Sequence, residues 1–242
     1  MERIWSSALP EHAGEAGSLA GWIPRFRQLS GVSFLILRDA KGLAQIVIDD
    51  PALVAEIARL PLESVVAVTG DAVAVEQAPN GVEVHDPRID VVSEATSPPP
   101  FDLFRPKIPA QLPTQLDHAP VALRHLRARA LARLSAMLVA GFRATLTELD
   151  FTEIHTPKIV AAATESGANV FAIDYFGRPA FLAQSPQLYK QIMVGVFERV
   201  FEVGPVFRAE PHDTPRHLNE YVSLDAEMGF ITDHTTVMAL LT

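Results

Sequence analysis

Two neighbouring segments near the C-terminal end combine charged side chains in a pattern suited to binding a charged ligand. Read as a strand, residues 220–230 put polar side chains on one face and apolar ones on the other, because side chains alternate along a strand. The polar face carries Tyr221, Ser223, Asp225 and Glu227. In residues 203–210, Arg208 and Glu210 share a face by the same count. A hairpin with one face this polar is not all core, so we expect that face to bind a ligand.

The loop between these two strands runs from Pro211 to Glu220 and is basic. It carries His212, Arg216 and His217. The two histidines alone are compatible with zinc, but the loop contains prolines and the chain has no cysteine. We therefore expect no metal site in this part of the chain.

A third polar set lies in residues 184–191. Ser185 followed by Pro186 is typical of a helix start, since serine caps the first turn and proline fits it. Gln187 and Lys190 are three residues apart, so they are neighbours near the start of this helix, where unpaired backbone N–H groups also point outward. The helix should extend to about residue 199. The apolar side chains that we expect to face the core are Leu188, Ile192 and Val196.

The N-terminal part, residues 1–94, reads as short strands separated by turn residues. Asp50 before Pro51 predicts one helix, Pro51–Leu60. The candidate strands are Gly21–Arg27, Val32–Arg38, Leu43–Ile48, Val65–Thr69, Val73–Val75, Val82–His85 and Ile89–Val92. About five strands with one interposed helix match the all-β OB-fold barrel, with another small barrel as the alternative.

Residues 95–120 and 121–242 differ sharply in pattern. The first stretch contains seven prolines, a density that predicts a stiff linker without regular helix. From Val121 to about Leu149 the pattern is helical, and its apolar stripe consists of Leu123, Leu126, Ala130, Leu134, Met137 and Leu138. Further strands are expected at Phe151–Thr156, Val170–Tyr175 and Ala180–Ala183. This predicts an α+β domain, an antiparallel sheet with flanking helices, that is incomplete at Thr242.

Composition sets the remaining limits. The 242 residues, 48% of them hydrophobic, can bury one large core or two modest ones. A net charge of −9 argues only weakly against nucleic acid, because binding depends on a local basic patch. The absence of cysteine excludes disulfides and thiolate metal sites. No apolar run has the length of a signal peptide or a membrane span, which predicts a cytoplasmic protein without a membrane partner.

These segments together resemble the class II aminoacyl-tRNA synthetases. Phe151-Thr-Glu-Ile-His-Thr-Pro157 is similar to motif 1, whose helix and strand form the dimer interface. Val206-Phe-Arg-Ala-Glu210 with Arg216-His-Leu-Asn-Glu220 resembles motif 2, the hairpin that holds ATP. Residues 21–47 resemble the anticodon-binding barrel of subclass IIb. Motif 3 and the main Mg²⁺ ligands would lie beyond Thr242, so the resemblance implies that the 242 residues alone are inactive.

The segment Gln184-Ser-Pro-Gln-Leu-Tyr-Lys-Gln191 is the most specific of these signals and looks like the signature of aspartyl-tRNA synthetases. Thr164-Glu-Ser-Gly167 is closer to the archaeal type of that family. The resemblance implies activation of L-aspartate by ATP, with Mg²⁺, to aspartyl-adenylate, followed by transfer to tRNA-Asp. It also implies a homodimer.

For ATP, the resemblance implies that Arg208 is the catalytic residue and binds the α-phosphate. Glu210 would accept from the adenine amino group, Arg216 and His217 would reach the terminal phosphates, and Tyr221 would stack on adenine. A surface ion pair between Arg208 and Glu210 is the alternative that involves no ligand.

For the amino acid, Lys190 would bind the side-chain carboxylate. If this lysine is buried without a counter-ion, it rejects asparagine, whose neutral amide leaves the charge unpaired. Asp225 and Glu165 would bind the ammonium group, and Gln187 and Ser185 would fix orientation. Alternatively, Lys190 is a solvated helix residue and Ser185 only a cap. Glu227 receives no role.

For tRNA, Phe34 would stack on an anticodon base and Gln45 would hydrogen-bond another, while Arg25 and Arg27 would hold phosphates. Periodicity alone does not decide whether Phe34 and Ile36, or Leu35 and Leu37, face the core. The alternative for Gln45 is an exposed strand position without a ligand.

The choice of tRNA rests on two prolines. Pro79 resembles the relaxed enzymes that also charge tRNA-Asn, whereas Pro24 occupies a place where those enzymes often carry histidine. Three other functions fit parts of the pattern: an asparaginyl-tRNA synthetase, a synthetase-like asparagine synthetase, and a non-catalytic RNA-binding paralogue.

Overall fold

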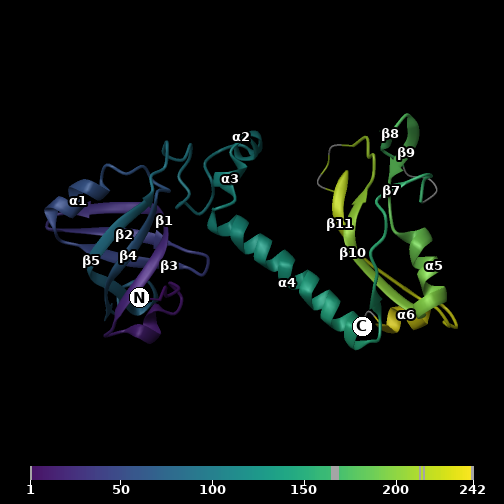
Figure 1. The fold of residues 1–242 in the computed structure, drawn as a ribbon, viewed down its shortest axis with the longest axis horizontal. Coiled ribbons are helices and arrows are strands. Elements are labelled where there is room, and N and C mark those ends of the chain that lie inside the picture. The colour runs from purple at the N-terminus through teal and green to yellow at the C-terminus, as the bar shows by residue number, and fades with distance from the viewer. Residues whose placement is uncertain (1, 165–168, 213, 215, 241–242) are drawn as a thin grey trace. The chain divides into compact units, whose positions relative to one another are not determined.

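The computed structural model describes residues 2–164, 169–212, 214 and 216–240, apart from the side chain of Pro79 (Figure 1). The chain divides into two compact units, Met1–Leu131 and Ala132–Thr242, and the division falls within helix α4 (Leu126–Glu148). None of the described helices is both long and apolar enough to cross a membrane.

The first unit is built on a closed five-stranded barrel. Its strands are β1 (Ala16–Leu29), β2 (Val32–Arg38), β3 (Leu43–Ile48), β4 (Val65–Ala74) and β5 (Val82–Ser93). They close in the order β1-β2-β3-β5-β4, with β3 and β5 parallel and the other neighbours antiparallel. The interior is filled by Leu19, Leu35, Leu37, Ile46, Ile48, Val66 and Val68, each at most 1% exposed. The expected all-β barrel is confirmed.

Strands β4 and β5 are each longer than predicted. Two candidate strands merge into β4, and two others merge into β5. Gly70 lies between the two candidate strands that merge into β4, where the register shifts between Thr69 and Asp71. A Cβ atom there would lie 2.5 Å from the carbonyl oxygen of His85. Gly70 therefore marks a close backbone approach at a bulge and not the end of a strand.

Helix α1 (Pro51–Ile57) confirms the predicted start, because the Asp50 carboxylate accepts from the backbone N–H of Ala52 at 2.9 Å. Two short 3-10 helices, η1 (Leu9–His12) and η2 (Pro79–Gly81), complete this part.

The prediction that residues 95–120 exclude helix is wrong. Short helices α2 (Leu112–Asp117) and α3 (Ala119–Ala122) occur there, each with a proline in its first two positions. Proline is tolerated at these positions because the first N–H groups of a helix have no intrahelical partner. The long helix expected from Val121 begins at Leu126 instead.

The second unit contains two small sheets, ordered β11-β10-β6 and β7-β9-β8. Its remaining elements are β6 (Thr152–Glu153), β7 (Ile159–Val160), β8 (Ala172–Tyr175), β9 (Arg178–Leu182), α5 (Gln187–Phe197), β10 (Arg199–Phe207), β11 (Glu220–Met228) and α6 (His234–Leu240). β6 pairs parallel with β10, and every other pair is antiparallel. The predicted motif 1 strand is thus reduced to two residues.

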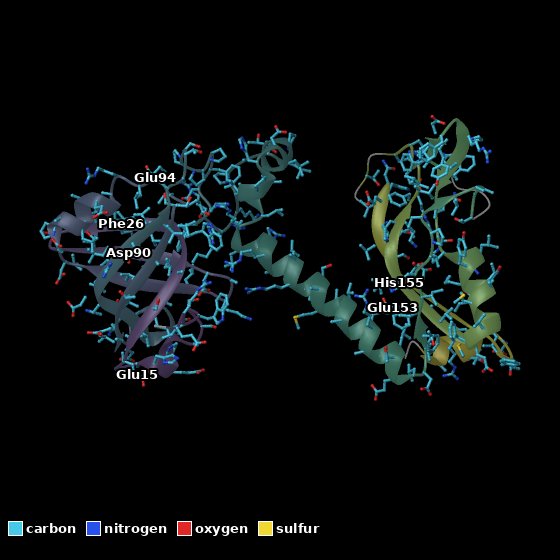
Figure 2. All side chains as sticks on the ribbon, in the orientation of Figure 1. Glu15, Phe26, Asp90, Glu94, Glu153 and His155 are labelled. Carbon is cyan, nitrogen blue, oxygen red and sulfur yellow. The ribbon has the colours of Figure 1, made fainter. Side chains whose placement is uncertain are left out.

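The apolar core of this unit lies on one face of β10 and β11. Phe201 of β10 packs with Leu146 of α4 and with Phe151, and Val203, Met228 and Leu240 pack against them. Arg143 of α4 also donates to Glu153 of β6 at 2.9 Å, and Glu153 is labelled in Figure 2. The alternate residues of β10 and β11 project from the opposite face of the hairpin.

Helix α5 is rotated relative to the prediction. Leu188, Ile192 and Val196, expected in the core, are 54%, 55% and 64% exposed. The side chain that α5 buries is Lys190. The charged face of the hairpin explains this orientation, since a lysine can be buried where carboxylates compensate it.

Candidate functional site

The predicted polar face of the hairpin is confirmed by its register. In β10 and β11, Glu202 pairs with Asp225, Gly204 with Ser223, and Val206 with Tyr221. Residues directly opposite one another project from the same face of a sheet. Tyr221, Ser223, Asp225 and Glu227 therefore share one face with Glu202, opposite the face that carries Phe201.

Pairing continues one step beyond the strands, which places Arg208 on the same face. Its N–H donates to the carbonyl of Asn219 at 2.9 Å. The guanidinium carbon of Arg208 lies 5.8 Å from the centroid of the Tyr221 ring. The backbone N–H of Glu210 donates to the side-chain oxygen of Asn219 at 3.1 Å. A guanidinium and an aromatic ring side by side can hold a phosphate and stack on a base, respectively.

In the loop after Arg208, residues 213 and 215 lie outside the described residues. Nδ1 of His217 and the Thr214 hydroxyl lie 2.7 Å apart, and the rings of His212 and His217 meet edge to face at 5.3 Å. Arg216 and His217 are exposed. The loop therefore presents basic side chains beside the polar face, while their proposed phosphate contacts remain predictions.

Lys190 of α5 contacts the end of the polar face that carries Asp225 and Glu227, and it is 5% exposed. Its ammonium group lies 3.1 Å from an oxygen of Asp225 and 3.3 Å from an oxygen of Glu227. Gln187 donates to the other oxygen of Glu227 at 3.3 Å. The expectation of a lysine without a counter-ion is wrong, because burying an uncompensated ammonium group is too costly. Glu227, which received no role from sequence, holds both Gln187 and Lys190.

Ser185 lies two residues before α5, and the predicted serine cap is wrong, because Pro186 occupies the N-cap position. The hydroxyl oxygen of Ser185 accepts from the N–H of Gln187 at 3.3 Å, although the helix itself begins at Gln187 and not at Pro186. The Thr164 hydroxyl accepts from the N–H groups of Gln184 and Ser185 at 3.1 and 3.2 Å. Glu165, the other residue predicted to bind the substrate ammonium, lies outside the described residues.

Sequence reasoning missed a second ionic group on the same face. Glu202 is 3% exposed and accepts from the Thr156 N–H, the Thr156 hydroxyl and the Lys158 ammonium group, at 2.8, 2.8 and 2.9 Å. The alternation of side chains along β10 could have revealed Glu202, because it lies an even number of residues from Arg208 and so projects from the same face. Lys158 could not be found in this way, because it reaches the hairpin from a distant segment.

The barrel carries a separate polar surface. Leu35 and Leu37 are fully buried in the barrel core, so Phe34 lies on the outer face of β2. Cross-strand pairing places Arg27 beside Phe34, and Arg25 and Gln45 on either side of Ile36. The ambiguity about Phe34 is thereby resolved, and all four predicted residues lie on one face of the barrel.

Gln45 is buried and held at both ends, so the alternative of an exposed strand position is excluded. Its amide nitrogen donates to Glu83 of β5 at 2.7 Å, and its amide oxygen accepts from Arg27 at 3.4 Å. His85 contacts the other oxygen of Glu83 at 3.2 Å. Glu83 was not predicted, although alternation along β5 puts it on the outer face. Pro79 belongs to η2, and its side chain lies outside the described structure.

Within the described residues, no group of three or more His, Cys, Asp or Glu side chains is placed to hold a metal ion.

Two family models match the chain. Residues 111–242 match tRNA synthetases class II (D, K and N), and residues 18–92 match the OB-fold nucleic acid binding domain. The aspartate–tRNA(Asp/Asn) ligase of Deinococcus radiodurans is 50% identical over 241 residues, which cover 99% of this chain and 54% of that protein. The protein of the same name from Archaeoglobus fulgidus is 46% identical, over 96% of this chain and 55% of its own length.

The solved structures that resemble this chain are also aminoacyl-tRNA synthetases. Asparaginyl-tRNA synthetase from Pyrococcus horikoshii, complexed with asparaginyl-adenylate, is 31% identical, with a TM-score of 0.91 over 100% of this chain and 56% of that one. Aspartyl-tRNA synthetase from Entamoeba histolytica is 29% identical, with a TM-score of 0.81 over 100% and 53%. The chain thus spans about half the length of its relatives. It belongs to the class II tRNA synthetases of the D, K and N group, and consists of an N-terminal OB-fold followed by part of an α+β class II catalytic domain.

Proposed function

We propose that this chain supplies the anticodon-binding barrel and the motif 1 and motif 2 part of an aspartyl-tRNA synthetase. The enzyme would activate L-aspartate with ATP and transfer it to tRNA-Asp and tRNA-Asn. The likeness to the aspartate–tRNA(Asp/Asn) ligases supports both tRNA substrates. The observation that carries the proposal is Lys190, a buried cation on the polar face of the hairpin.

Lys190 can select a carboxylate because its ammonium group has three N–H donors. Among the described residues, Asp225 and Glu227 accept two of them, and the third can donate to the side chain of aspartate. An asparagine amide would turn either a neutral oxygen or a donor N–H₂ group toward this cation. Asp225 and Glu227 already compensate the charge of Lys190, so the discrimination rests on the third N–H, which pairs more strongly with a carboxylate than with a neutral amide. Glu165 and Asp225 provide negative charge for the α-ammonium group, and Ser185 and Gln187 fix the orientation.

Arg208 would hold the α-phosphate of ATP, as the catalytic residue. A carboxylate oxygen of aspartate attacks the α-phosphorus, and the bond from phosphorus to the pyrophosphate oxygen breaks. A guanidinium fork can neutralise the charge that develops on the α-phosphate oxygens. Tyr221, next to Arg208, offers a face for adenine, Glu210 an acceptor for its amino group, and Arg216 and His217 positive charge for the terminal phosphates. Mg²⁺ would add further neutralisation when bound with ATP.

The barrel face with Phe34 would bind the anticodon. An aromatic ring flanked by Arg25 and Arg27 suits an unstacked base and its phosphates. Gln45 is rigidly oriented by Arg27 and Glu83, so its remaining donor and acceptor positions can distinguish bases. Pro79 would contribute to the choice between the two tRNAs.

A homodimer is supported by the surface of α4. Leu134, Met137 and Leu138 are 54%, 71% and 62% exposed along one helix. An apolar stripe of this kind is typical of a surface that a second copy covers.

An asparaginyl-tRNA synthetase is the second candidate, favoured by the high structural similarity to such an enzyme. Under the first candidate Lys190 binds the side-chain carboxylate of aspartate, and under the second it faces the neutral side-chain amide of asparagine. Lysine is disfavoured as substrate under both candidates, because its side-chain ammonium group would face the ammonium group of Lys190.

Pyrophosphate exchange by the gene product that contains this chain separates the candidates. We expect exchange with aspartate and none with asparagine or lysine. Lys190→Met should lower kcat/KM for aspartate on the order of 100-fold or more, since a buried charge pair to the ligand is lost. Lys41→Met, at an exposed lysine of the barrel, is the matched control and should have no effect. Exchange with asparagine would support the second candidate, and no exchange with any of the three would leave only RNA binding.

A further inference from the structure

We propose that Lys158 is a positioning residue for the binding of aspartate, although it does not touch the substrate itself. Its ammonium group neutralises Glu202 and so keeps Lys190 available for the carboxylate of the ligand. This inference rests on the proposed function, in which Lys190 binds aspartate.

Glu202 is the most deeply buried carboxylate on the polar face. Its side chain is 4% exposed, and that of Lys158 is 20% exposed. One oxygen of Glu202 accepts from the N–H of Thr156, and the other accepts from the Thr156 hydroxyl and from Lys158. A buried carboxylate in this position requires a positive charge nearby, and Lys158 supplies it.

Gly204 shows that Lys158 lies on the ligand-binding face. A Cβ atom at Gly204 would lie 3.3 Å from Cε and 3.4 Å from Nζ of Lys158, and 3.5 Å from Oε1 of Glu202. Gly204 pairs with Ser223, so its Cβ direction belongs to the face of Ser223 and Asp225. The lysine therefore crosses β10 where no side chain intervenes, and places a second ammonium group on the same face as Lys190.

The charges on this face form two adjacent groups. One contains Lys158 and Glu202, and the other contains Lys190, Asp225 and Glu227. Glu202 and Asp225 are direct cross-strand partners, and the Cβ atoms of such partners are about 4.5–5.5 Å apart. If Glu202 lacked Lys158, its charge would repel Asp225 and attract Lys190. Lys190 would then be drawn from the ligand toward Glu202.

Lys158 itself is a poor candidate for direct contact with the substrate. Its ammonium group donates to Glu202 at 2.9 Å and to the Thr156 hydroxyl at 3.0 Å. Its effect on the binding of aspartate must therefore be indirect, through the charge balance around Lys190.

The test uses Lys158→Met in the gene product that contains this chain. We expect KM for aspartate in pyrophosphate exchange to rise about tenfold or more, since a partly buried charge pair is broken, while KM for ATP stays within about twofold. Calorimetric titration with aspartate should show the same loss of affinity. The double variant Lys158→Met with Glu202→Gln removes both charges and should restore most of the affinity for aspartate.

Thr156→Val is the matched control, because it removes a hydrogen bond to Glu202 without changing the charge. It should leave KM for aspartate nearly unchanged. An unaltered KM in Lys158→Met, or a double variant as impaired as the single one, would overturn the inference. If Lys158→Met does not fold, the KM of the double variant for aspartate is compared with that of the unmodified protein. A rise of about tenfold or more would overturn the inference. Absence of aspartate exchange in the unmodified protein would instead refute the proposed function.

Discussion

Glu63, in the first unit, provides a quantitative test of how this barrel is stabilised. Its carboxylate, 5% exposed, accepts two hydrogen bonds from Arg38 at 2.8 and 2.6 Å and a third from Arg124 at 2.8 Å. Glu63 also has a φ of 72°, a left-handed conformation that costs a non-glycine residue about 1–2 kcal/mol. A strained position that keeps a glutamate indicates that the carboxylate contributes more than the strain costs.

Glu63→Gln should lower the free energy of unfolding of the barrel by about 3 kcal/mol. Breaking a buried ion pair from one side costs roughly 3–5 kcal/mol, because the remaining charge is left uncompensated, and the amide oxygen retains part of the bonding. The side chain of Arg38 is only 8% exposed, so water cannot replace the lost carboxylate. For a domain of this size, that change corresponds to a Tm lower by roughly 12–24 °C.

Tryptophan fluorescence during chemical and thermal unfolding measures this change selectively. The chain has two tryptophans, Trp5 and Trp22, and both belong to the first unit. The ring of Trp22 also lies within 6 Å of the guanidinium carbons of Arg38 and Arg124, at 5.7 and 5.9 Å. Its emission therefore reports directly on the region that the substitution alters.

Arg124→Gln is the matched control. The side chain of Arg124 is 35% exposed, so its pair with Glu63 is screened by solvent and should contribute less than about 1 kcal/mol. The reasoning fails if Glu63→Gln costs less than about 1 kcal/mol, or if Arg124→Gln costs as much as Glu63→Gln.

Three further predictions follow from single contacts. Burial opposes ionisation of Asp39, but hydrogen bonds from Ser6, Gly42 and Lys41 outweigh it and hold the pKa of its carboxyl below the usual value. The stabilisation is therefore present above about pH 4 and is lost as pH falls through the lowered pKa, so Asp39→Asn should cost about 2 kcal/mol at pH 7 and less at pH 3 in urea titrations. Gly21→Ala should unfold the barrel, because the new Cβ would lie 2.2 Å from a backbone oxygen, whereas Gly141→Ala, with open space around it, should be neutral or stabilising. Unfolding of both variants is followed by far-UV circular dichroism, because Gly141 belongs to the second unit, which has no tryptophan. Phe34→Ala should weaken tRNA binding roughly 10- to 100-fold through lost stacking and leave aspartate-dependent pyrophosphate exchange intact; loss of both activities would contradict the separate roles of the two units.

Sequence reasoning succeeded where structure depends on local alternation. The polar face of Tyr221 to Glu227 and the cap at Asp50 follow from periodicity and from short-range hydrogen bonds, and both are confirmed. The same reasoning could not decide which side of β2 faces the barrel core, since Phe34 and Leu35 are both apolar. Only the closure of the barrel, which buries Leu35 completely, decides it.

Two of the errors in prediction, the orientation of α5 and the missed pairing of Glu202, involve partners that are distant in sequence. The orientation of α5 is governed by Asp225 and Glu227, which follow Lys190 by more than thirty residues, and no pattern within the helix reveals them. The apolar residue Leu188 was assigned to the core on the assumption that only apolar faces are buried. The pairing of Glu202 with Lys158 was also missed because the two residues are distant in sequence: it joins β10 to a segment that precedes α5.

The contrast between the strand connections of the two units has a consequence for how the chain folds. The barrel closes when β1 pairs with β4, as in Gly17 with Gly70, and when β3 pairs with β5, so it requires contacts between distant segments. The hairpin of β10 and β11 is joined by a single loop, with Phe207 opposite Glu220. Because loop closure over long separations slows folding, we expect the hairpin to form early and the barrel late. The strands that carry the polar face would then be in register before the barrel face proposed to bind RNA is formed.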